Sequence, residues 1–326
     1  MIQVGIVGGT GYVAGELLRI LMLHTGVEIR FVYSHSHAGE KITTVHDDLF
    51  PLENMYFTDK VFPDADVVFL CLGHGHSSRF LTENHFSEKT KIIDLSNDFR
   101  LKENRQFGNR HFVYGLTEIN HQQVQTADST ANPGCFATAI QLALLPLAHD
   151  KLLENEIHIH GITGSTGAGK GLSETTHFSW RNNNISVYKA FTHQHLGEIK
   201  ETLTSYQKEA SRYPFHFIPF RGDFSRGIFV TAYTRSALSE KELQEKYRQF
   251  YAKSIFTRVT DQNIHLKQVV NTNYCLIHVE KHENMAFITA AIDNLLKGAA
   301  GQAVENMNLM CGFPQDTGLK LKAVYY

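Results

Sequence analysis

The chain is short of cysteine, of proline and of long apolar runs, and each shortage excludes a class of protein. Its 4 cysteines are scattered without a Cys-x-x-Cys pair, which excludes a disulfide framework and a cysteine zinc site and fits a reducing compartment. With 7 prolines and 24 glycines in 326 residues, collagen-like, coiled-coil and wholly disordered chains are excluded. The longest apolar runs, residues 67–72 and the proline-broken 142–148, fall far short of the ~20 residues of a membrane span.

The chain also lacks an excess of one charge. Its 31 Lys and Arg residues against 33 Asp and Glu residues give a formal net charge of −2, so nothing indicates nucleic acid or a strongly basic partner. The first residues show neither a basic segment nor a cleavage site, so no targeting signal is evident. We therefore expect a cytoplasmic protein that works without a nucleic-acid or membrane partner.

Short apolar runs alternate with helix-period stretches over the first 150 residues. The predicted strands are residues 4–7, 29–33, 67–72, 92–95 and 128–131, and an apolar helix is predicted at 136–147. Strands that alternate with helices imply a parallel sheet covered on both faces, which is an α/β fold.

After about residue 156 the pattern changes. Apolar alternation predicts strands of a more antiparallel sheet near residues 157–159, 215–217, 228–233, 274–279 and 287–292, with helices at 198–209 and 239–252. No low-complexity linker separates the two patterns. We therefore expect a boundary between two domains near residue 150.

The first predicted strand runs into a glycine-rich turn that predicts a nucleotide site. The segment reads Gly8-x-x-Gly11-x-x-x-Gly15 between a strand and a helix, a variant of the dinucleotide fingerprint. Such glycines let the backbone turn tightly and approach a pyrophosphate, whose charge sits at the helix N-terminus. The alternative is a turn that only joins strand to helix.

The end of the second predicted strand favours NADP over NAD. NAD sites carry an Asp or Glu there that holds the ribose 2′-hydroxyl, whereas this chain has Ser34-His35-Ser36, followed by Lys41. Hydroxyls, a protonated imidazole and an ammonium group suit a 2′-phosphate. The alternative is a solvent-exposed polar turn.

A second glycine loop, residues 164–170, matches G-x-x-x-x-G-K. A P-loop needs Ser or Thr next, but residue 171 is Gly, and the loop falls in the second predicted domain. We expect it to line a cofactor or substrate and not to bind ATP.

Cys135 is the strongest nucleophile candidate. It follows Asn132-Pro133-Gly134 and opens the predicted apolar helix, where the helix dipole and free backbone N–H groups favour a thiolate and could hold an oxyanion. Cys71 and Cys275 fall in predicted strands and Cys311 follows a helix, which is typical of small core residues. The alternative for Cys135 is a packed helix start.

A thiolate of this kind needs an acid or base, and the segment from His193 to Glu198 offers two histidines two residues apart. An extended segment leading to a helix near Leu196 would point the two imidazoles to opposite sides. A metal could also bind a His-x-His pair, but no third ligand is evident, so we expect no metal. Most of the 19 histidines are expected to be surface or polar-network residues.

These residues resemble the N-acyl-gamma-glutamyl-phosphate reductases of arginine biosynthesis, usually the N-acetyl form. The similar stretches are GIVGGTGY (5–12), IDLSNDFR (93–100), YGL (114–116), ANPGC (131–135), GAGK (167–170), HQHLGE (193–198) and DNLLKGAAGQA (293–303). They span nearly the whole chain in the family's order, which makes the set specific.

The resemblance implies a Rossmann NADP(H)-binding domain, residues 1–150 with the returning C-terminal segment of about 298–326. It also implies a second α+β domain, residues 151–297, of the aspartate-semialdehyde-dehydrogenase and GAPDH-like type, for catalysis, substrate binding and assembly into a homo-oligomer, dimeric or tetrameric. The implied reaction reduces an N-acyl-gamma-glutamyl phosphate to the semialdehyde and phosphate through a thioester on Cys135, with His195 as the acid or base.

The site residues expected on these grounds fall into two further groups. The cofactor would contact Gly8, Thr10, Gly11, Tyr12, Val13, Ser34, Ser36, Gly167 and Asn294. The acyl-phosphate substrate would contact Arg100, Asn132, His193, Glu198, Lys170 and Arg226, with Arg100 as the phosphate-binding arginine.

Three departures from the family pattern leave the acyl group open. Thr117 stands where the family usually has Pro, residues 136–138 read Phe-Ala-Thr for Tyr-Pro-Thr, and Gln194 and Gly197 replace Arg and Pro. An N-succinyl substrate is therefore an alternative to N-acetyl. Two different functions also stay open: an aspartate-semialdehyde dehydrogenase, and an NADP-binding regulator without activity.

Overall fold

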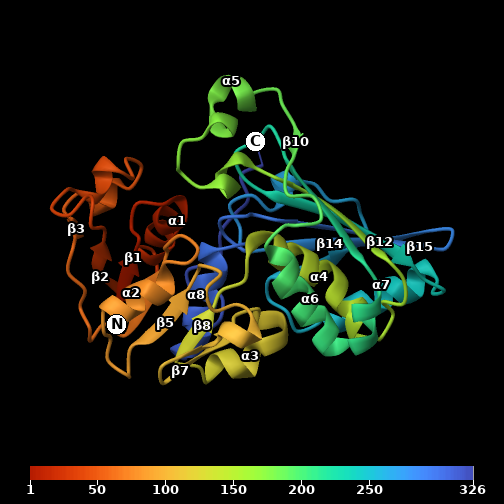
Figure 1. Cartoon of the computed structure of the whole chain (residues 1–326), viewed down its shortest axis with the longest axis horizontal. Coiled ribbons are helices and arrows are strands. Elements are labelled where there is room, and N and C mark those ends of the chain that lie inside the picture. Colours follow the sequence, from red (N-terminus) through yellow and green to blue (C-terminus); the bar gives the residue numbers. More distant parts are fainter. Residues whose placement is uncertain (326) are drawn as a thin grey trace. The chain divides into compact units, whose positions relative to one another are not determined.

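The computed structural model describes residues 1–325 and divides into two units. Unit 1 comprises Met1–Gly134 and Ala299–Lys320, and unit 2 comprises Cys135–Gly298 together with the last segment from Leu321. The strands of each unit form one sheet (Figure 1).

Unit 1 is a mostly parallel sheet with helices. Its elements are β1 (Ile2–Val7), α1 (Tyr12–Leu21), β2 (Val27–Tyr33), β3 (Phe57–Thr58), β4 (Val67–Leu70), α2 (Ser77–Glu83), β5 (Lys91–Asp94), β6 (Gln106–Phe107), β7 (Arg110–Tyr114), α3 (Thr117–Gln125), β8 (Ser129–Ala131) and α8 (Ala300–Met310). The strand order is β3-β2-β1-β4-β5-β8-β7-β6, and only the β6–β7 pair is antiparallel. The chain leaves β1 toward β2 and returns to its other side as β4, so the carboxyl ends of β1 and β4 form the switch point where α/β sheets bind ligands.

The predicted strands of the first half are confirmed in β1, β2, β4, β5 and β8. All of β4 is buried, as the continuous apolar run of a parallel strand requires. Strand β4 ends at Leu70 and not at residue 72 as predicted, so Cys71 lies just beyond its end. Strand β7 was not expected, because its sequence, Arg-His-Phe-Val-Tyr, mixes polar and apolar residues.

The C-terminal helix α8 completes unit 1. All of its residues are buried, and it packs against α1, α3 and β5. Its polar residues find partners there: the Asn306 amide donates to the Gly115 carbonyl at 3.0 Å, and His24 bonds the Asn308 amide oxygen at 2.9 Å. These bonds remove much of the cost of burying amides in a helix that is enclosed on all sides.

Unit 2 is a mixed sheet packed against helices (Figure 1). Its elements are α4 (Cys135–His149), β9 (Ile157–Thr163), α5 (Phe178–Arg181), β10 (Ser186–Val187), α6 (His195–Tyr206), β11 (Phe215–Arg221), β12 (Ile228–Arg235), α7 (Glu240–Phe250), β13 (Thr257–Thr260), β14 (Cys275–His282) and β15 (Met285–Ile292). The order is β10-β11-β9-β12-β15-β14-β13. Only β11–β9 and β13–β14 pair in parallel, so the more antiparallel sheet predicted for the second half is confirmed.

Helix α4 runs through the core of unit 2 and contains a proline. Every residue from Phe136 to Ala148 is buried, which fits a helix that is apolar all round. Pro146 has no N–H, so the carbonyl of Leu142, one turn earlier, loses its helical donor. The hydroxyl of Tyr251, the C-cap residue of α7, donates to that carbonyl at 2.5 Å instead.

The boundary between the units lies before α4, and not near residue 150 as predicted. Helix α4 packs against α6, α7 and the strands β12, β14 and β15, because an apolar helix must be covered on every side. The last segment also differs from expectation, since it lies with unit 2. There the Val324 N–H donates to the Val270 carbonyl at 3.1 Å, and the Asn271 amide donates to the Lys322 carbonyl at 3.0 Å.

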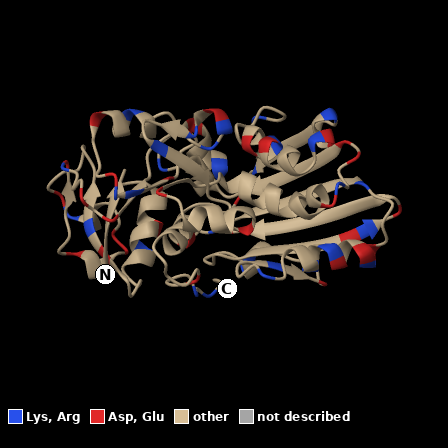
Figure 2. Ribbon diagram, turned by 90° about the horizontal axis from the view of Figure 1, so that it is seen from below, with Lys and Arg blue, Asp and Glu red and all other residues tan. Residues whose placement is uncertain are grey.

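Charged residues of both signs are interleaved along the elements of each unit (Figure 2). Among residues 1–325, none of the helices combines the length and the apolar character that crossing a bilayer requires.

Candidate functional site

The turn after β1 brings backbone groups close together at the switch point of the sheet. Gly8 has a φ of +82°, the left-handed region that favours glycine, and a Cβ there would lie 2.6 Å from the Cys71 carbonyl oxygen. Gly11 caps α1 without a side-chain bond, the first turn of α1 holds no acid, and a Cβ on Gly11 would meet nothing within 4 Å. An uncapped helix start beside a tight turn fits a pyrophosphate.

The end of β2 lies beside this turn. The N–H groups of Gly8 and Gly9 both donate to the Tyr33 carbonyl, at 3.1 and 3.0 Å. Ser34, the next residue, is buried, whereas Ser36 is exposed. The other residues predicted to contact the cofactor here, Thr10, Tyr12 and Val13, are half-exposed or exposed along the same turn and helix start.

A buried carboxyl group organises the loops after β4 and β5. Asp94 ends β5 and accepts hydrogen bonds from the Ser77 hydroxyl at 2.6 Å and the Ser96 hydroxyl at 2.8 Å. Burial raises the pKa of Asp94 to about 6, although those hydroxyls, the Ser96 N–H and the charge of Arg100 oppose the rise. Four residues later, the carboxylate of Asp98 accepts a hydrogen bond from the backbone N–H of Gly75 at 2.6 Å. The stretch 93–100 therefore fixes the carboxyl edge of the sheet.

The raised pKa of Asp94 predicts a pH-dependent contribution to stability. A carboxyl whose pKa is higher in the folded chain favours folding below its unfolded pKa, 3.8, and that contribution is lost as the pH rises through about 6. Relative to Asp94→Asn, the wild-type chain should therefore lose roughly 2 kcal/mol of unfolding free energy between about pH 4 and pH 7. Urea unfolding of both chains across this range measures the difference.

The exposed Asp59 provides a matched control for this measurement. Asp59→Asn makes the same chemical change at the surface, and its difference from wild type should stay flat across the same pH range. A difference for Asp94→Asn that is equally flat would contradict the proposed contribution of the buried carboxyl group.

Among the cysteines, Cys135 alone begins a helix and is partly exposed at that position. It is the first residue of α4. Cys275 is buried, burial together with the charge of Asp94 raises the pKa of Cys71 far above its usual value, and burial raises that of Cys311 to about 11. These three thiols are therefore held protonated or inaccessible, which leaves Cys135 as the thiol suited to nucleophilic chemistry.

The two histidines lie side by side, and not on opposite sides of an extended segment as predicted. Gln194 between them has helical dihedral angles, and α6 begins at His195. The His195 N–H donates to His193 Nδ1 at 3.2 Å, and the two ring centroids are 4.6 Å apart. The turn brings the His193 ring against the N–H of the first residue of α6, and Gln194 is the N-cap. Glu198, in the first turn of the same helix, is also buried.

Aromatic side chains enclose the His193 ring. Phe136, next to the nucleophile, lies 5.6 Å from it, Phe217 of β11 lies 5.5 Å away, and Tyr188 lies 5.8 Å away, in each case edge to face. The start of α4 and the start of α6 are thereby brought together inside unit 2, where the two helices pack against each other.

Tyr188 and Arg221 belong to this cluster, and sequence reasoning missed both. Burial raises the pKa of the Tyr188 hydroxyl, the nearby charge of Arg221 opposes the rise, and the charge of Cys135 adds to it. The Arg221 guanidinium lies 4.7 Å over the Tyr188 ring. Tyr188 follows a two-residue strand and Arg221 ends β11, and neither position carries a local sequence signal.

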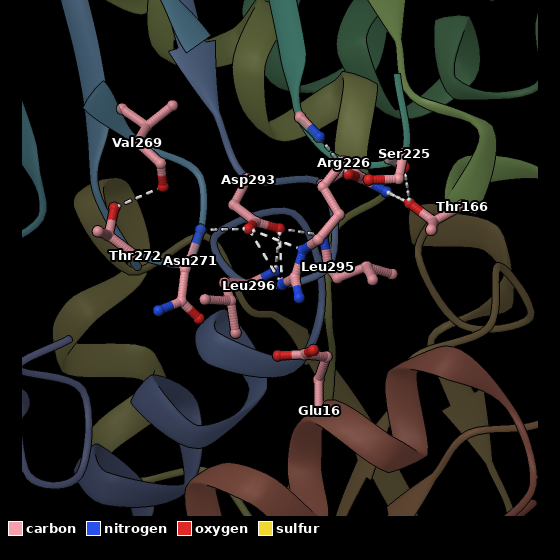
Figure 3. Close-up of polar contacts among 12 residues, drawn as sticks. Glu16, Thr166, Ser225, Arg226, Val269, Asn271, Thr272, Asp293, Leu295 and Leu296 are labelled. Carbon is pink, nitrogen blue, oxygen red and sulfur yellow. Dashed lines mark hydrogen bonds and ion pairs between the residues drawn. The ribbon is translucent and has the colours of Figure 1, made fainter. Parts of the chain in front are cut away.

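The turn after β15 holds a backbone segment against the nucleophile. The buried Asp293 carboxylate accepts from the N–H groups of Asn271 at 2.6 Å and Leu295 at 2.8 Å (Figure 3). Its own carbonyl accepts from the Gly298 N–H at 3.0 Å. A Cβ on Gly298 would lie 2.7 Å from the Cys135 Cβ, so only glycine lets the backbone come this close to the start of α4.

Arg226 is part of this turn. Its guanidinium donates to both carboxylate oxygens of Asp293, at 3.1 and 3.2 Å (Figure 3). A two-pronged ion pair with a buried carboxylate fixes the orientation of the guanidinium. The geometry shows that Arg226 holds the turn, and its predicted contact with the substrate stays a prediction.

Asn294, which is predicted to contact the cofactor, fastens the second glycine loop. Its amide oxygen accepts from the Gly227 N–H at 2.7 Å, and its amide nitrogen donates to the Thr166 hydroxyl at 3.0 Å. Gly167 lies next to this contact in a short 3-10 turn, and Lys170 is exposed. Both ends of the buried amide are therefore bound within unit 2, and the predicted cofactor contact of Asn294 stays a prediction.

The side chains of Arg100 and Asn132 both bind backbone carbonyl groups, and Arg100 binds the carbonyl of Asn132 itself. The buried Arg100 guanidinium donates to the carbonyls of Asn132 at 2.9 Å and Leu95 at 3.0 Å. The Asn132 amide donates to the Ala299 carbonyl at 3.2 Å and accepts from Asn306 at 3.0 Å. Asn132 thus shapes the turn before Cys135, and its predicted substrate contact stays a prediction.

Solved structures share this fold at low sequence identity. Aspartate semialdehyde dehydrogenase II from Vibrio cholerae matches with a TM-score of 0.71 and 16% identity, covering 96% of this chain and 99% of that one. Aspartate semialdehyde dehydrogenase with NADP from Candida albicans matches with a TM-score of 0.70 and 14% identity, covering 95% of this chain and 98% of that one. These similarities establish the two-domain architecture expected from the sequence.

Curated relatives are much closer in sequence. The N-acetyl-gamma-glutamyl-phosphate reductase of Flavobacterium johnsoniae is 57% identical over 322 residues, covering 99% of each chain. The protein of the same name from Christiangramia forsetii is 53% identical over 326 residues and covers 100% of both chains.

Family models match both halves of the chain. Residues 3–127 match the semialdehyde dehydrogenase NAD binding domain, and residues 135–294 match the semialdehyde dehydrogenase dimerisation domain. The second match begins at Cys135, where unit 2 also begins. With both units matched and relatives of one name identical at more than half of all positions, the chain belongs to the semialdehyde dehydrogenase family and, within it, to the N-acetyl-gamma-glutamyl-phosphate reductases.

Proposed function

We propose that the chain reduces N-acetyl-gamma-glutamyl phosphate to N-acetyl-glutamate 5-semialdehyde and inorganic phosphate with NADPH. One observation carries the proposal: Cys135 begins a helix beside a cluster of His193, His195 and Tyr188, while the other three thiols are buried or held protonated. Such a site suits covalent capture of an acyl group.

The first step proposed is attack of the Cys135 thiolate on the acyl carbon. The bond between that carbon and the phosphate oxygen breaks, inorganic phosphate leaves, and a thioester remains on Sγ. The backbone N–H groups at the start of α4 would hold the oxyanion. Covalent capture has a chemical purpose, because a carboxylate is a poor hydride acceptor and a thioester is a good one.

The second step proposed reduces the thioester. Bound NADPH would supply the hydride to the thioester carbon. His195 would donate a proton to the resulting oxyanion and take it back when the carbon–sulfur bond breaks, which releases the aldehyde and restores the thiolate. His193 would hold the start of α6 through the bond that it accepts from the His195 N–H, and so orient His195.

Unit 1 offers the residues that would bind the cofactor. The left-handed Gly8 and the uncapped start of α1 at Gly11 fit the pyrophosphate, and the Gly8 and Gly9 bonds to Tyr33 place Ser34 and the residues after it beside that turn. Thr10, Tyr12 and Val13 belong to the turn and the start of α1, and Ser36 follows β2. We propose that these residues also contact the cofactor. Glu40, the first acid after Ser34 in the sequence, is engaged with His37 at 3.1 Å.

NADPH should be preferred over NADH, because the end of β2 offers hydroxyls where an NAD site has an acid. A charge-assisted hydrogen bond to the 2′-phosphate contributes about 1.5–3 kcal/mol, so kcat/KM should favour NADPH by roughly tenfold or more. Steady-state kinetics with both cofactors measure the ratio. Ser36→Asp should lower it by repelling the phosphate, whereas Ser36→Ala should change it less. Equal kcat/KM values for the two cofactors in the wild type would refute the preference.

Several cations are candidates for the substrate phosphate. Arg100 remains the candidate that the family resemblance favours, with its guanidinium already fixed by two carbonyls. Lys170 is exposed on the second glycine loop. Arg221 stands beside Tyr188 and the nucleophile cluster, and we propose it as an additional anion-binding residue.

The decisive assay runs the reaction in reverse. NADP⁺ reduction is followed with N-acetyl-glutamate semialdehyde, N-succinyl-glutamate semialdehyde and aspartate semialdehyde, each with and without inorganic phosphate. The proposal expects phosphate-dependent turnover that is fastest with the N-acetyl substrate. A faster reaction with the succinyl compound would show that the substrate carries an N-succinyl group. A faster reaction with aspartate semialdehyde would show that the chain is an aspartate-semialdehyde dehydrogenase. No turnover with any of the three would favour an NADP-binding regulator without activity.

We further propose that the chain forms a homo-oligomer through unit 2 in the cytoplasm. Support for assembly comes from the match of residues 135–294 to a dimerisation domain. Support for the compartment comes from the free thiols of all four cysteines, as a reducing environment leaves them. Light scattering distinguishes a dimer from a tetramer.

A further inference from the structure

A cluster of metal-ligating side chains stands in unit 2 apart from the nucleophile. Glu156 directly precedes β9, His158 is the second residue of β9, and His216 is the second residue of β11. The two strands are parallel neighbours, and His158 and His216 are register partners. The two imidazoles therefore stand side by side on one face of the sheet, next to the carboxylate of Glu156.

The ligand atoms of the three residues converge. The Glu156 Oε2 atom lies 3.0 Å from His216 Nε2 and 3.8 Å from His158 Nε2, and all three ligand atoms lie within 4.8 Å of one another. Metal–ligand bonds of about 2.0–2.2 Å in a tetrahedral site place neighbouring ligand atoms roughly 3.3–3.5 Å apart. Small side-chain rotations would bring the three atoms to that spacing around one ion.

Aromatic neighbours fix the two imidazole rings. The Tyr233 ring stacks on His158 with centroids 4.9 Å apart at 9°, His158 stacks on His216 at 4.9 Å and 22°, and Phe191 meets His216 edge to face at 6.0 Å. Rings held in this way keep their Nε2 atoms on the carboxylate side. Preorganised ligands lose less freedom when a metal binds.

In the single chain the cluster is partly exposed. The side chains of His158, His216 and Glu156 are 36%, 34% and 58% exposed, which leaves room for a water as a fourth ligand. Their strand neighbours Ile157, Ile159 and Phe217 are buried on the opposite face. Phe217 packs against His193. The metal-ligating trio and the histidines near Cys135 therefore lie on opposite faces of β11.

We propose that Glu156, His158 and His216 bind a divalent transition metal of the Zn²⁺ class. Two neutral imidazoles and one carboxylate form a donor set that suits Zn²⁺, whereas Ca²⁺ and Mg²⁺ prefer oxygen ligands alone. The ion replaces the hydrogen bond between His216 and Glu156. It ties the start of β9 to the start of β11. The histidine content of the sequence gave no hint of this site, because its ligands come from segments about 60 residues apart.

Isothermal titration of the Cys135→Ser full-length chain with ZnCl₂, in a buffer free of chelators, tests the proposal. The Cys135→Ser background removes the thiolate that could bind zinc together with the nearby histidines. One Zn²⁺ per chain is expected. Loss of an outer-shell partner alone typically costs 10–100-fold in metal affinity, so Glu156→Gln, His158→Gln and His216→Gln should each weaken binding at least tenfold.

His160→Gln provides the matched control. His160 is the next residue on the same face of β9 and also packs near Tyr233, but it does not belong to the trio, so its loss should leave zinc affinity unchanged. Thermal unfolding without metal checks that each variant folds, and Zn²⁺ should raise the Tm of the background chain more than that of any folded trio variant. The proposal is overturned if the background chain binds no Zn²⁺ at micromolar concentration, if the folded trio variants bind it as tightly, or if His160→Gln weakens binding equally.

Discussion

Cys135→Ser is expected to abolish turnover and to leave cofactor affinity intact. A serine hydroxyl has almost no ionised fraction at neutral pH, so the acyl intermediate cannot form at a useful rate. Cofactor affinity should survive because the glycine turn belongs to unit 1, whereas Cys135 opens unit 2. Steady-state assays give the activity, and titration with NADPH gives the affinity.

Cys311→Ser is the matched control for this substitution. Its thiol is partly buried, follows α8 and has a pKa raised to about 11, so the variant should keep near wild-type kcat. If Cys135→Ser kept more than about a tenth of the activity, a barrier change of only ~1.4 kcal/mol, covalent catalysis through this residue would be wrong.

His195→Asn is expected to lower kcat more than His193→Asn. Accepting the His195 N–H requires an unprotonated Nδ1 on His193, and three aromatic rings enclose the His193 ring. Those contacts suit a residue that positions its neighbour. General acid–base assistance contributes about 10²–10⁴-fold, so His195→Asn should lose at least a hundredfold in kcat.

Single-turnover measurements separate the chemical step from binding. Alkylation of Cys135 should still proceed in both variants, which serves as a check that the site is assembled. A larger loss of kcat in His193→Asn would reverse the two roles. If His195→Asn changed only KM, His195 would not act in the chemical step.

Sequence reasoning succeeded where the signal is local. The glycine turn lies between a strand and a helix, and Cys135 begins a helix, because both patterns depend on a few consecutive residues. The same reasoning failed for the histidines, since an alternating His-x-His pattern does not show that the His193 ring lies against the first N–H of the next helix. It also failed at the unit boundary, because an apolar helix such as α4 can pack with either half of a chain.

Contacts between residues that are far apart in the chain could not be predicted from the sequence. Arg226 and Asn294 carry polar groups whose partners are far away along the chain, and only the fold shows that Asp293 and Gly227 occupy them. Tyr188 and Arg221 reach the nucleophile from a short edge strand and a strand end. Their places depend on how β10, β11 and β9 pair, which no local pattern encodes.

The proline in α4 also constrains the order in which the chain can change during evolution. While Pro146 is present, the Leu142 carbonyl depends on Tyr251, and losing that hydroxyl first would leave a buried acceptor unsatisfied at a cost of about 1–3 kcal/mol. If residue 146 first regained an N–H, the helix would supply its own donor and Tyr251 could vary. A descendant that lacks the tyrosine is therefore expected to have lost the proline earlier.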